Sequence, residues 1–392
     1  MSLDLPVLKS DWIFRRWYFD MYLLIPTAIL ISLGFVMVAS ASFSYAEQRF
    51  GNELFFVKRH GLYVLLGIAT LITSFIVPSA WWSRYSWLLI IVSIFLLWLV
   101  LIPGFGISLN GSKRWLALGG WTMQVSELVK LATIFFVSAF LARYRRRMAD
   151  DWRTWGVLLG VMGIINILLI LEPDYGSVVV ISGIFMALLF LGGIKLRIFV
   201  SIMMLAIAGL LALVLFSQYR LERIIAFTNP WADPHDNGYQ LIQSLIALGR
   251  GEWFGVGLGQ SIQKMEFLPD GYTDFIFAIY AEEFGFVGTI LILLVFAILV
   301  SRIFQLSARA MGLKDWFAAY VCVGIGLLIS GQTFINVGVN SGLLPTKGLT
   351  LPFVSYGGTS LLCCCASIGI LMRFSNDLHH RANPNGRYHY AG

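Results

Sequence analysis

Long apolar runs recur along the chain between short polar segments, which is the pattern of a helical membrane protein. A hydrocarbon core of about 30 Å needs roughly 20 apolar residues in a helix. On this criterion the sequence predicts about ten spans, at 21–41, 62–78, 86–105, 124–142, 156–172, 177–194, 197–216, 276–300, 316–339 and 350–372. We therefore predict an all-α fold, a polytopic membrane bundle of about ten transmembrane helices.

The distribution of charge predicts the orientation of this bundle. An even number of spans places both termini on one side, and the loops on that side carry far more Lys and Arg than the opposite loops. These residues are Arg15, Arg16, Arg84, Arg143, Arg145, Arg146, Arg147, Arg153, Lys195, Arg197, Arg302, Arg309, Lys314, Arg373, Arg381 and Arg387, against Lys58, Arg59, Lys113, Arg114 and Lys347. By the positive-inside rule both termini are cytoplasmic. We predict cytoplasmic tails at 1–20 and 374–392 around a transmembrane domain at 21–373.

Composition agrees with a membrane protein. Hydrophobic residues make up 58% of the chain and charged residues 12%, whereas soluble domains have about half and a quarter. The net charge of +7 reflects topology, and we predict no nucleic-acid partner. The cysteines and histidines show no ligand spacing, so no metal site built from protein ligands alone is predicted.

One connection is much longer than the others. Residues 217–275 contain no long apolar run and form an extracytoplasmic loop between the seventh and eighth helices. Ordered loops of this length are usually functional. The segment is rich in Gly and aromatic residues, so we expect it to fold against the membrane.

Charged residues at the edge of the fourth span form the first candidate group. Glu127 and Lys130 are three apart, so they share a helix face and can pair. One interpretation is a structural ion pair, with Ser126 as the helix cap. The other is a polar wall facing a lipid headgroup, with Lys113 and Arg114 beside it to bind phosphate. The sequence leaves both open.

Carboxylates near two other span ends are further candidates. Asp174 either caps the next helix or acts in a site. Asp274, after the possible cap Thr273, is placed in the first turn of the eighth span, where the helix dipole favours an ionised carboxylate. Glu282 and Glu283 are expected about 12 Å deeper at 1.5 Å per residue. For Asp274 a helix-start role and a catalytic role are both open from the residue alone.

Several motifs occur in a fixed order that resembles the FtsW/RodA (SEDS) family of glycosyltransferases, and in particular its division-specific FtsW branch. They cover roughly residues 15–375. The motifs are Tyr219-Arg220-x-x-Arg223, Asn229-Pro230-Trp231, Gly238-Tyr239-Gln240-x-x-x-Ser244-Leu245, Phe254-Gly255-x-Gly257, Gln263-Lys264, Thr273-Asp274-Phe275-Ile276-Phe277, Leu344-Pro345-Thr346-Lys347-Gly348 and Ser355-Tyr356-Gly357-Gly358.

The resemblance implies a function. Members polymerise lipid II into glycan strands on the outer face of the bacterial cytoplasmic (inner) membrane, at the division septum. They work with a class B penicillin-binding protein, a transpeptidase, and with other membrane proteins of the division machinery. Asp274 matches the residue taken as catalytic, and Gln124, Glu127 and Lys130 match the family motif Q-P-x-E-x-x-K, with Val125 in place of Pro. Two further departures are Glu172, where Gln is common, and Asp270 with Tyr272, which stand where Glu and His are frequent.

The chemistry of sugar transfer then suggests roles. It needs a base for the acceptor hydroxyl and positive charge for the departing diphosphate. We predict Asp274 as the base and a divalent cation (Mg²⁺ or Mn²⁺) bridging the diphosphate, with no organic cofactor. The predicted substrate-binding residues are Lys113, Arg114, Gln124, Glu127, Lys130, Arg220, Arg223, Gln240, Ser244, Lys264 and Lys347. A lipid II flippase and a division scaffold are the alternatives. Against a transporter, no inverted repeat is seen.

Overall fold

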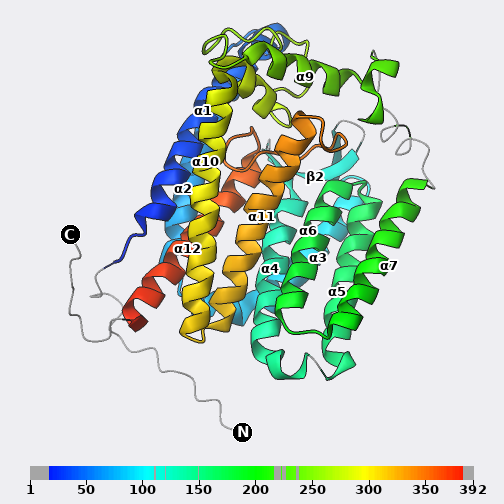
Figure 1. The fold of residues 1–392 in the computed structure, drawn as a ribbon, viewed down its shortest axis with the longest axis vertical. Helices are drawn as coiled ribbons and strands as arrows, with labels where there is room; N and C mark the ends of the chain where they lie inside the picture. Colours follow the sequence, from blue (N-terminus) through cyan, green and yellow to red (C-terminus); the bar gives the residue numbers. More distant parts are fainter. Residues whose placement is uncertain are drawn as a thin grey trace.

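The computed structural model describes residues 17–382 apart from 110, 111, 120, 149, 216–221, 223–226 and 235–237. Its long helices lie side by side, and the loop before α10 covers one end of the bundle (Figure 1). The elements are α1 (Met21–Phe50), α2 (Phe55–Ile76), α3 (Ser79–Leu101), β1 (Gly106–Leu109), β2 (Ser112–Leu118), β3 (Trp121–Gln124), α4 (Val125–Tyr144), η1 (Arg145–Arg147), α5 (Trp152–Leu171), α6 (Tyr175–Leu191), α7 (Leu196–Leu215), η2 (Pro230–Ala232), α9 (Tyr239–Gly251), α10 (Ile276–Gly312), α11 (Trp316–Asn340) and α12 (Gly358–Ala382).

The predicted polytopic bundle is confirmed. Within the described residues, eight helices are long and apolar enough to cross a membrane, and α6 and the described part of α7 are shorter apolar helices at the sixth and seventh predicted spans. The bundle has an inner and an outer layer. In α4, α11 and α12, 72%, 67% and 83% of the apolar window is buried, against 22–39% in the other five. The inner helices therefore pack on protein, while the outer ones keep apolar faces for lipid.

A small antiparallel sheet, with strand order β1-β2-β3, connects α3 to α4 and was not predicted. Leu116 pairs with Gly106 on one side and with Met123 on the other, and the β1–β2 register shifts between Ile107 and Ser108. The strands have four, seven and four residues. Segments this short give little periodic signal, so an expectation based on apolar runs overlooks them.

The start of the last predicted span, at residue 350, was wrong. Helix α12 begins at Gly358, and residues 344–357 form an irregular segment. Pro352 has no backbone N–H and disfavours helix for the residue before it. Leu351, Phe353 and Val354 are nevertheless buried, so their apolar run reflects a loop packed inside the protein.

Helix α10 is two helical segments joined at Gly285, not the straight span expected from residue 276. Gly285 has φ 67° and ψ −166°, and a Cβ there would lie 2.3 Å from the backbone nitrogen of Gly255, so only glycine fits this close approach. The carbonyls of Glu282 and Glu283 accept hydrogen bonds from Val256 and Gly257 of the long loop, at 3.0 and 3.1 Å.

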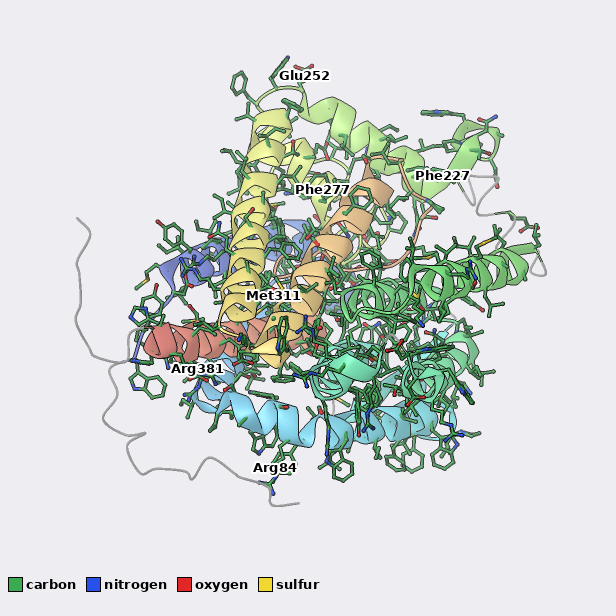
Figure 2. The ribbon with its side chains drawn as sticks, turned by 60° about the horizontal axis from the view of Figure 1, so that its bottom comes forward. Arg84, Phe227, Glu252, Phe277, Met311 and Arg381 are labelled. Carbon is green, nitrogen blue, oxygen red and sulfur yellow. The ribbon has the colours of Figure 1, made fainter. Side chains whose placement is uncertain are left out.

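The two glutamates therefore lie beside the outer loop and not about 12 Å further into the membrane, as was expected from a straight helix. In Figure 2, Phe277 lies between Glu252 and Met311 and not beyond Glu252. This placement agrees with a change of direction at Gly285. The long loop itself is folded, because it contains η2 and α9.

Candidate active site

Asp274 lies in a tight turn just before α10. Its backbone N–H and that of Thr273 donate to the carbonyl of Asp270, both at 3.1 Å. The helix begins only at Ile276, so the expected place of Asp274 within the first helical turn was wrong. Thr273 is not the cap either, because its hydroxyl donates to the Asp270 carbonyl at 3.1 Å.

Two asparagines of α11 hold this turn from below. The Nδ2 atoms of Asn336 and Asn340 donate to the backbone carbonyl of Asp274, at 2.8 and 3.2 Å. Asn336 also donates to the carbonyl of Leu349 at 2.7 Å, and Asn340 accepts from the N–H of Ala278 at 3.1 Å. Sequence reasoning missed both residues. The signal was present, since amides spaced four apart in an apolar span are costly unless they have partners.

The carboxylate of Asp274 lies against the loop after α11 and close to one arginine. A Cβ on Gly348 would lie 2.6 Å from Asp274 Oδ2. Burial and the negative charge of Asp270 raise the pKa of Asp274 to about 7, while the positive charge of Arg114 lowers it. A carboxylate with a pKa near neutrality is suited to act as a general base.

Arg114 is positioned by the turn between α5 and α6. Its Nη2 donates to the carbonyl of Pro173 at 2.7 Å, and its Nη1 lies 3.8 Å from Asp174 Oδ1. Asp174 also caps α6, one of the two roles considered for it, by accepting from the N–H of Ser177. Strand β2, the α5–α6 turn, the turn before α10 and the loop after α11 thus supply the surroundings of Asp274.

Only some of the predicted basic residues reach this place. The positive charge of Arg114 lowers the pKa of Asp274, and Lys347 adjoins Gly348, which contacts Asp274. Lys113 is exposed and, because successive residues of a strand face opposite sides, it points away from Arg114. Lys264 is buried in an ion pair with Glu283 at 3.0 Å. Arg220 and Arg223 lie outside the described residues.

The two predicted residues of α9 have different surroundings. Ser244 is buried, and its hydroxyl donates to the backbone carbonyl of Asn340 at 2.8 Å. It therefore connects α9 to the end of α11, which holds the Asp274 turn. Gln240, four residues earlier on α9, is partly buried, and its contact with substrate stays a prediction.

Glu127 and Lys130 form the predicted pair, with Lys130 Nζ 2.7 Å from Glu127 Oε1 and the lysine side chain fully buried. Ser126 is not the cap, because α4 begins at Val125 after Gln124. A mostly apolar cavity of about 600 Å³ adjoins α4. It lies among α2, α3, α4, α12 and β3, and its walls include Leu128.

Glu172 is the least expected feature of the site. It is fully buried, and neither carboxylate oxygen has a hydrogen-bond partner among the described residues. Burial and Asp174 raise the pKa of Glu172 to about 8, against a lowering by Arg114. Glu172 is therefore mainly protonated at neutral pH. A protonated carboxyl is a poor cation ligand.

The described residues do not fit a resident metal ion. No group of three or more His, Cys, Asp or Glu side chains among them could hold one. Asp174 already has partners in Arg114 and Ser177.

These features define a class. It is a helical membrane protein that has, at one end of its bundle, an arginine and a carboxylate whose pKa is close to neutral pH. The chain belongs to the FtsW/RodA/SpoVE family of cell cycle proteins, whose family model matches residues 21–380.

Relatives and solved structures agree with this membership. The chain is 46% identical to a probable peptidoglycan glycosyltransferase FtsW of Saccharophagus degradans, over 99% of both chains. It is 44% identical to one of Coxiella burnetii, over 92% of this chain and 96% of the relative. A chain from a peptidoglycan synthase complex, studied for its coordination of polymerization and crosslinking, superposes with a TM-score of 0.76 at 25% identity, over 92% and 98% of the two chains. A mutant of the rod shape determining protein RodA of Thermus thermophilus gives 0.67 at 25% identity, over 91% and 97%.

Proposed function

We propose that the chain is a peptidoglycan glycosyltransferase that polymerises lipid II into glycan strands during septal cell-wall synthesis. The names of the FtsW relatives support this activity. The observation that carries it is Asp274, a carboxylate with a pKa of about 7 whose turn is fixed by two asparagines. Neither a passive scaffold nor a helix cap requires a carboxylate of this kind.

The proposed reaction joins an acceptor sugar to a donor glycan. Asp274 takes the proton from the acceptor hydroxyl. The oxygen of that hydroxyl attacks the anomeric carbon of the donor at the same time. The bond from that carbon to the diphosphate oxygen breaks, and the polyprenyl diphosphate leaves with the bonding electrons. Arg114 and Lys347 stabilise the negative charge that develops on it. The apolar cavity beside α4 is suited to a polyprenyl chain.

The proposed setting is the bacterial cytoplasmic membrane at the division septum, with both termini in the cytoplasm. The uneven distribution of Lys and Arg supports this orientation. We propose a class B penicillin-binding protein and other division proteins as partners. The structural relative within a peptidoglycan synthase complex supports such an assembly.

The deciding experiment incubates the purified protein, with and without its transpeptidase partner, with lipid II and resolves glycan polymer on a gel. We expect polymer from the wild type. Asp274→Asn should lower the rate by roughly 10²–10⁴-fold while unfolding and partner binding stay unchanged. If the variant polymerises within a few-fold of wild type, Asp274 is not the base.

A lipid II flippase is the second candidate, favoured by the fully buried Lys130 and its ion pair inside α4. Lipid flipping in vesicles by a protein that makes no polymer under either condition would support it. A divalent cation bridging the substrate diphosphate stays a prediction. It is tested by adding a chelator to the same assay and restoring Mg²⁺ or Mn²⁺ separately.

A further inference from the structure

A second polar site lies at the end of the bundle opposite α9, where α4 ends (Figure 1). Helix α4 ends there and continues into η1. A cavity of about 540 Å³ is lined by residues 142–147 and by Trp316, the first residue of α11. We call it the arginine recess, because Arg143, Arg145, Arg146 and Arg147 form most of its wall.

The four arginines of the recess lack acidic partners. All four are exposed, and within the part of the chain that the structure describes none of their nitrogens lies within 4.0 Å of a carboxylate oxygen. Their nearest acidic neighbours in sequence have other partners. Asp150 pairs with Lys195 at 3.4 Å, and Asp151 caps α5.

Other basic residues among those expected on this side do pair. In each of these pairs a guanidinium nitrogen of an Arg lies 2.6–3.1 Å from a carboxylate oxygen of an Asp. They are Arg302–Asp20, Arg373–Asp377 and Arg381–Asp315. Pairing with an Asp is therefore common on this side, and the recess gathers four neighbouring arginines that lack such a partner.

A tryptophan from another helix completes the recess. The guanidinium carbon of Arg145 lies 3.4 Å from the centroid of the Trp316 ring. Stacking on an aromatic face orients a guanidinium group. The Arg145 side chain also makes a hydrogen bond with Tyr320, and the remainder of its five N–H donors can face an anion. Tryptophan is also typical of membrane interfaces, where lipid headgroups lie.

Two simpler explanations account for the charge alone. Basic residues are expected in cytoplasmic loops, and cations near a helix C-terminus complement its dipole. Neither explanation requires a cavity, or a tryptophan ring from α11 stacked on one of the guanidinium groups. Those two features are typical of a site for an anion.

We propose that the arginine recess binds the phosphate of an anionic membrane phospholipid in the leaflet that faces this end of the bundle. Guanidinium groups donate paired hydrogen bonds to phosphate oxygens. Basic pockets between helices on the cytoplasmic side are suited to anionic headgroups. Free diphosphate has the same chemistry, but the position at a helix end, beside apolar lipid-facing surfaces, favours the lipid.

The test measures lipid retention by the full chain, using native mass spectrometry after addition of phosphatidylglycerol or phosphatidylethanolamine. The wild type should retain phosphatidylglycerol preferentially. Replacing residues 145, 146 and 147 of η1 by Gln should weaken retention by at least about tenfold, since each lost charge-assisted bond is worth more than a neutral one.

A charge-matched control replaces three exposed arginines of the same side by Gln, namely Arg84, Arg153 and Arg309. The side chain of Arg84 points away from the bundle (Figure 2). This control should retain the lipid within about threefold of wild type, a difference of well under 1 kcal/mol. Trp316→Leu keeps every charge and should still weaken retention, so the proposal stays testable if the triple variant folds poorly.

Three results would overturn the proposal. Equal loss in the charge-matched control would show that net charge alone attracts lipid. Equal retention of the two lipids would show no anion preference. Sodium pyrophosphate that binds the wild type, while phosphatidylglycerol is not retained, would assign the recess to free diphosphate. The readout involves no turnover, so it is independent of the proposed activity.

Discussion

At the scale of single residues, the pKa of Asp274 predicts how activity depends on pH. The base must be ionised, so the rate should rise as pH increases through about 7. Asp270→Asn removes the negative charge that helps to raise this pKa, so the acid limb of the profile should move to lower pH. The measurement is the initial polymerisation rate against pH for the wild type and this variant.

Unfolding does not account for that acid limb. A carboxyl whose folded pKa is raised contributes stability that is present below its unfolded pKa and is lost as pH rises through the folded value. Asp274 therefore stabilises the fold at acid pH and not at alkaline pH. An acid limb that stays in place when Asp270 is neutralised would contradict the assignment.

The Glu127–Lys130 pair gives a second prediction at this scale. Glu127→Gln leaves the fully buried Lys130 ammonium without its counter-charge, which should cost about 3–5 kcal/mol of unfolding free energy. The exchanged variant, Glu127→Lys with Lys130→Glu, should recover much of this loss. Thermal unfolding in detergent measures both.

Polymerisation by the exchanged variant then separates the two interpretations of the pair. A purely structural pair retains much of its activity after exchange, because each charge still has its partner. A pair that binds substrate loses activity although the protein is folded. A stable Glu127→Gln variant would show that Lys130 does not depend on Glu127.

At the scale of elements, the sequence predicted those parts of the fold that depend on long apolar runs. The seven spans before the long loop and the span at 316–339 lie where apolar runs predicted them, because a helix in lipid must satisfy its own backbone. The 344–357 segment was misread, because burial in protein produces the same apolar signal as burial in lipid. Helix α9 was missed because it is a short amphipathic helix of 13 residues, which has no long apolar run and does not span.

The candidate site was also predicted only in part. Asp274 and Arg114 were identified from sequence, since charges at span ends are conspicuous. The opposite faces of Lys113 and Arg114 depend on strand β2, which was not predicted. The pairing of Lys264 with Glu283 depends on the break at Gly285. A single glycine in an apolar run does not predict such a break.

The asparagines of α11 give a prediction at this scale, because they fix the turn that carries Asp274 before α10. Asn336→Ala removes a donor from the carbonyls of both Asp274 and Leu349, at a cost of about 1–3 kcal/mol in stability. We expect kcat to fall by about tenfold with KM little changed, since a displacement of the base is felt at the chemical step. Steady-state kinetics on lipid II would measure the split.

The matched control is Thr333→Val on the same helix. The Thr333 hydroxyl is buried and has no partner among the described residues, so its removal should leave kcat unchanged. Asn336→Asp restores the size but not the donor and should not rescue the rate. An equal fall in kcat for Thr333→Val would indicate a general effect on α11.

At the scale of the whole molecule, the two ends of the bundle differ in chemistry. One end carries the folded loop with α9, and the other carries the end of α4, where the arginine recess lies (Figure 1). The inner helices α4 and α11 contribute to both, since α4 begins near the sheet and ends at η1. This arrangement separates the proposed site for sugar chemistry from the proposed site for lipid phosphate, and the buried helices α4 and α11 lie between them.

The described ends of the chain are joined to the bundle by one buried ion pair, which gives the last prediction. Asp20, just before α1, is fully buried and accepts from Arg302 of α10 at 2.8 Å and from Ser375 of α12 at 2.8 Å. Asp20→Asn removes the one carboxylate that pairs with Arg302 among the described residues, so unfolding free energy should fall by about 3–5 kcal/mol. The control Arg381→Gln breaks a half-exposed pair with Asp315 and should cost at most about 1 kcal/mol. Thermal unfolding of both variants in the same detergent compares them, and equal midpoints would show that the Asp20–Arg302 pair does not hold the first and last helices to α10.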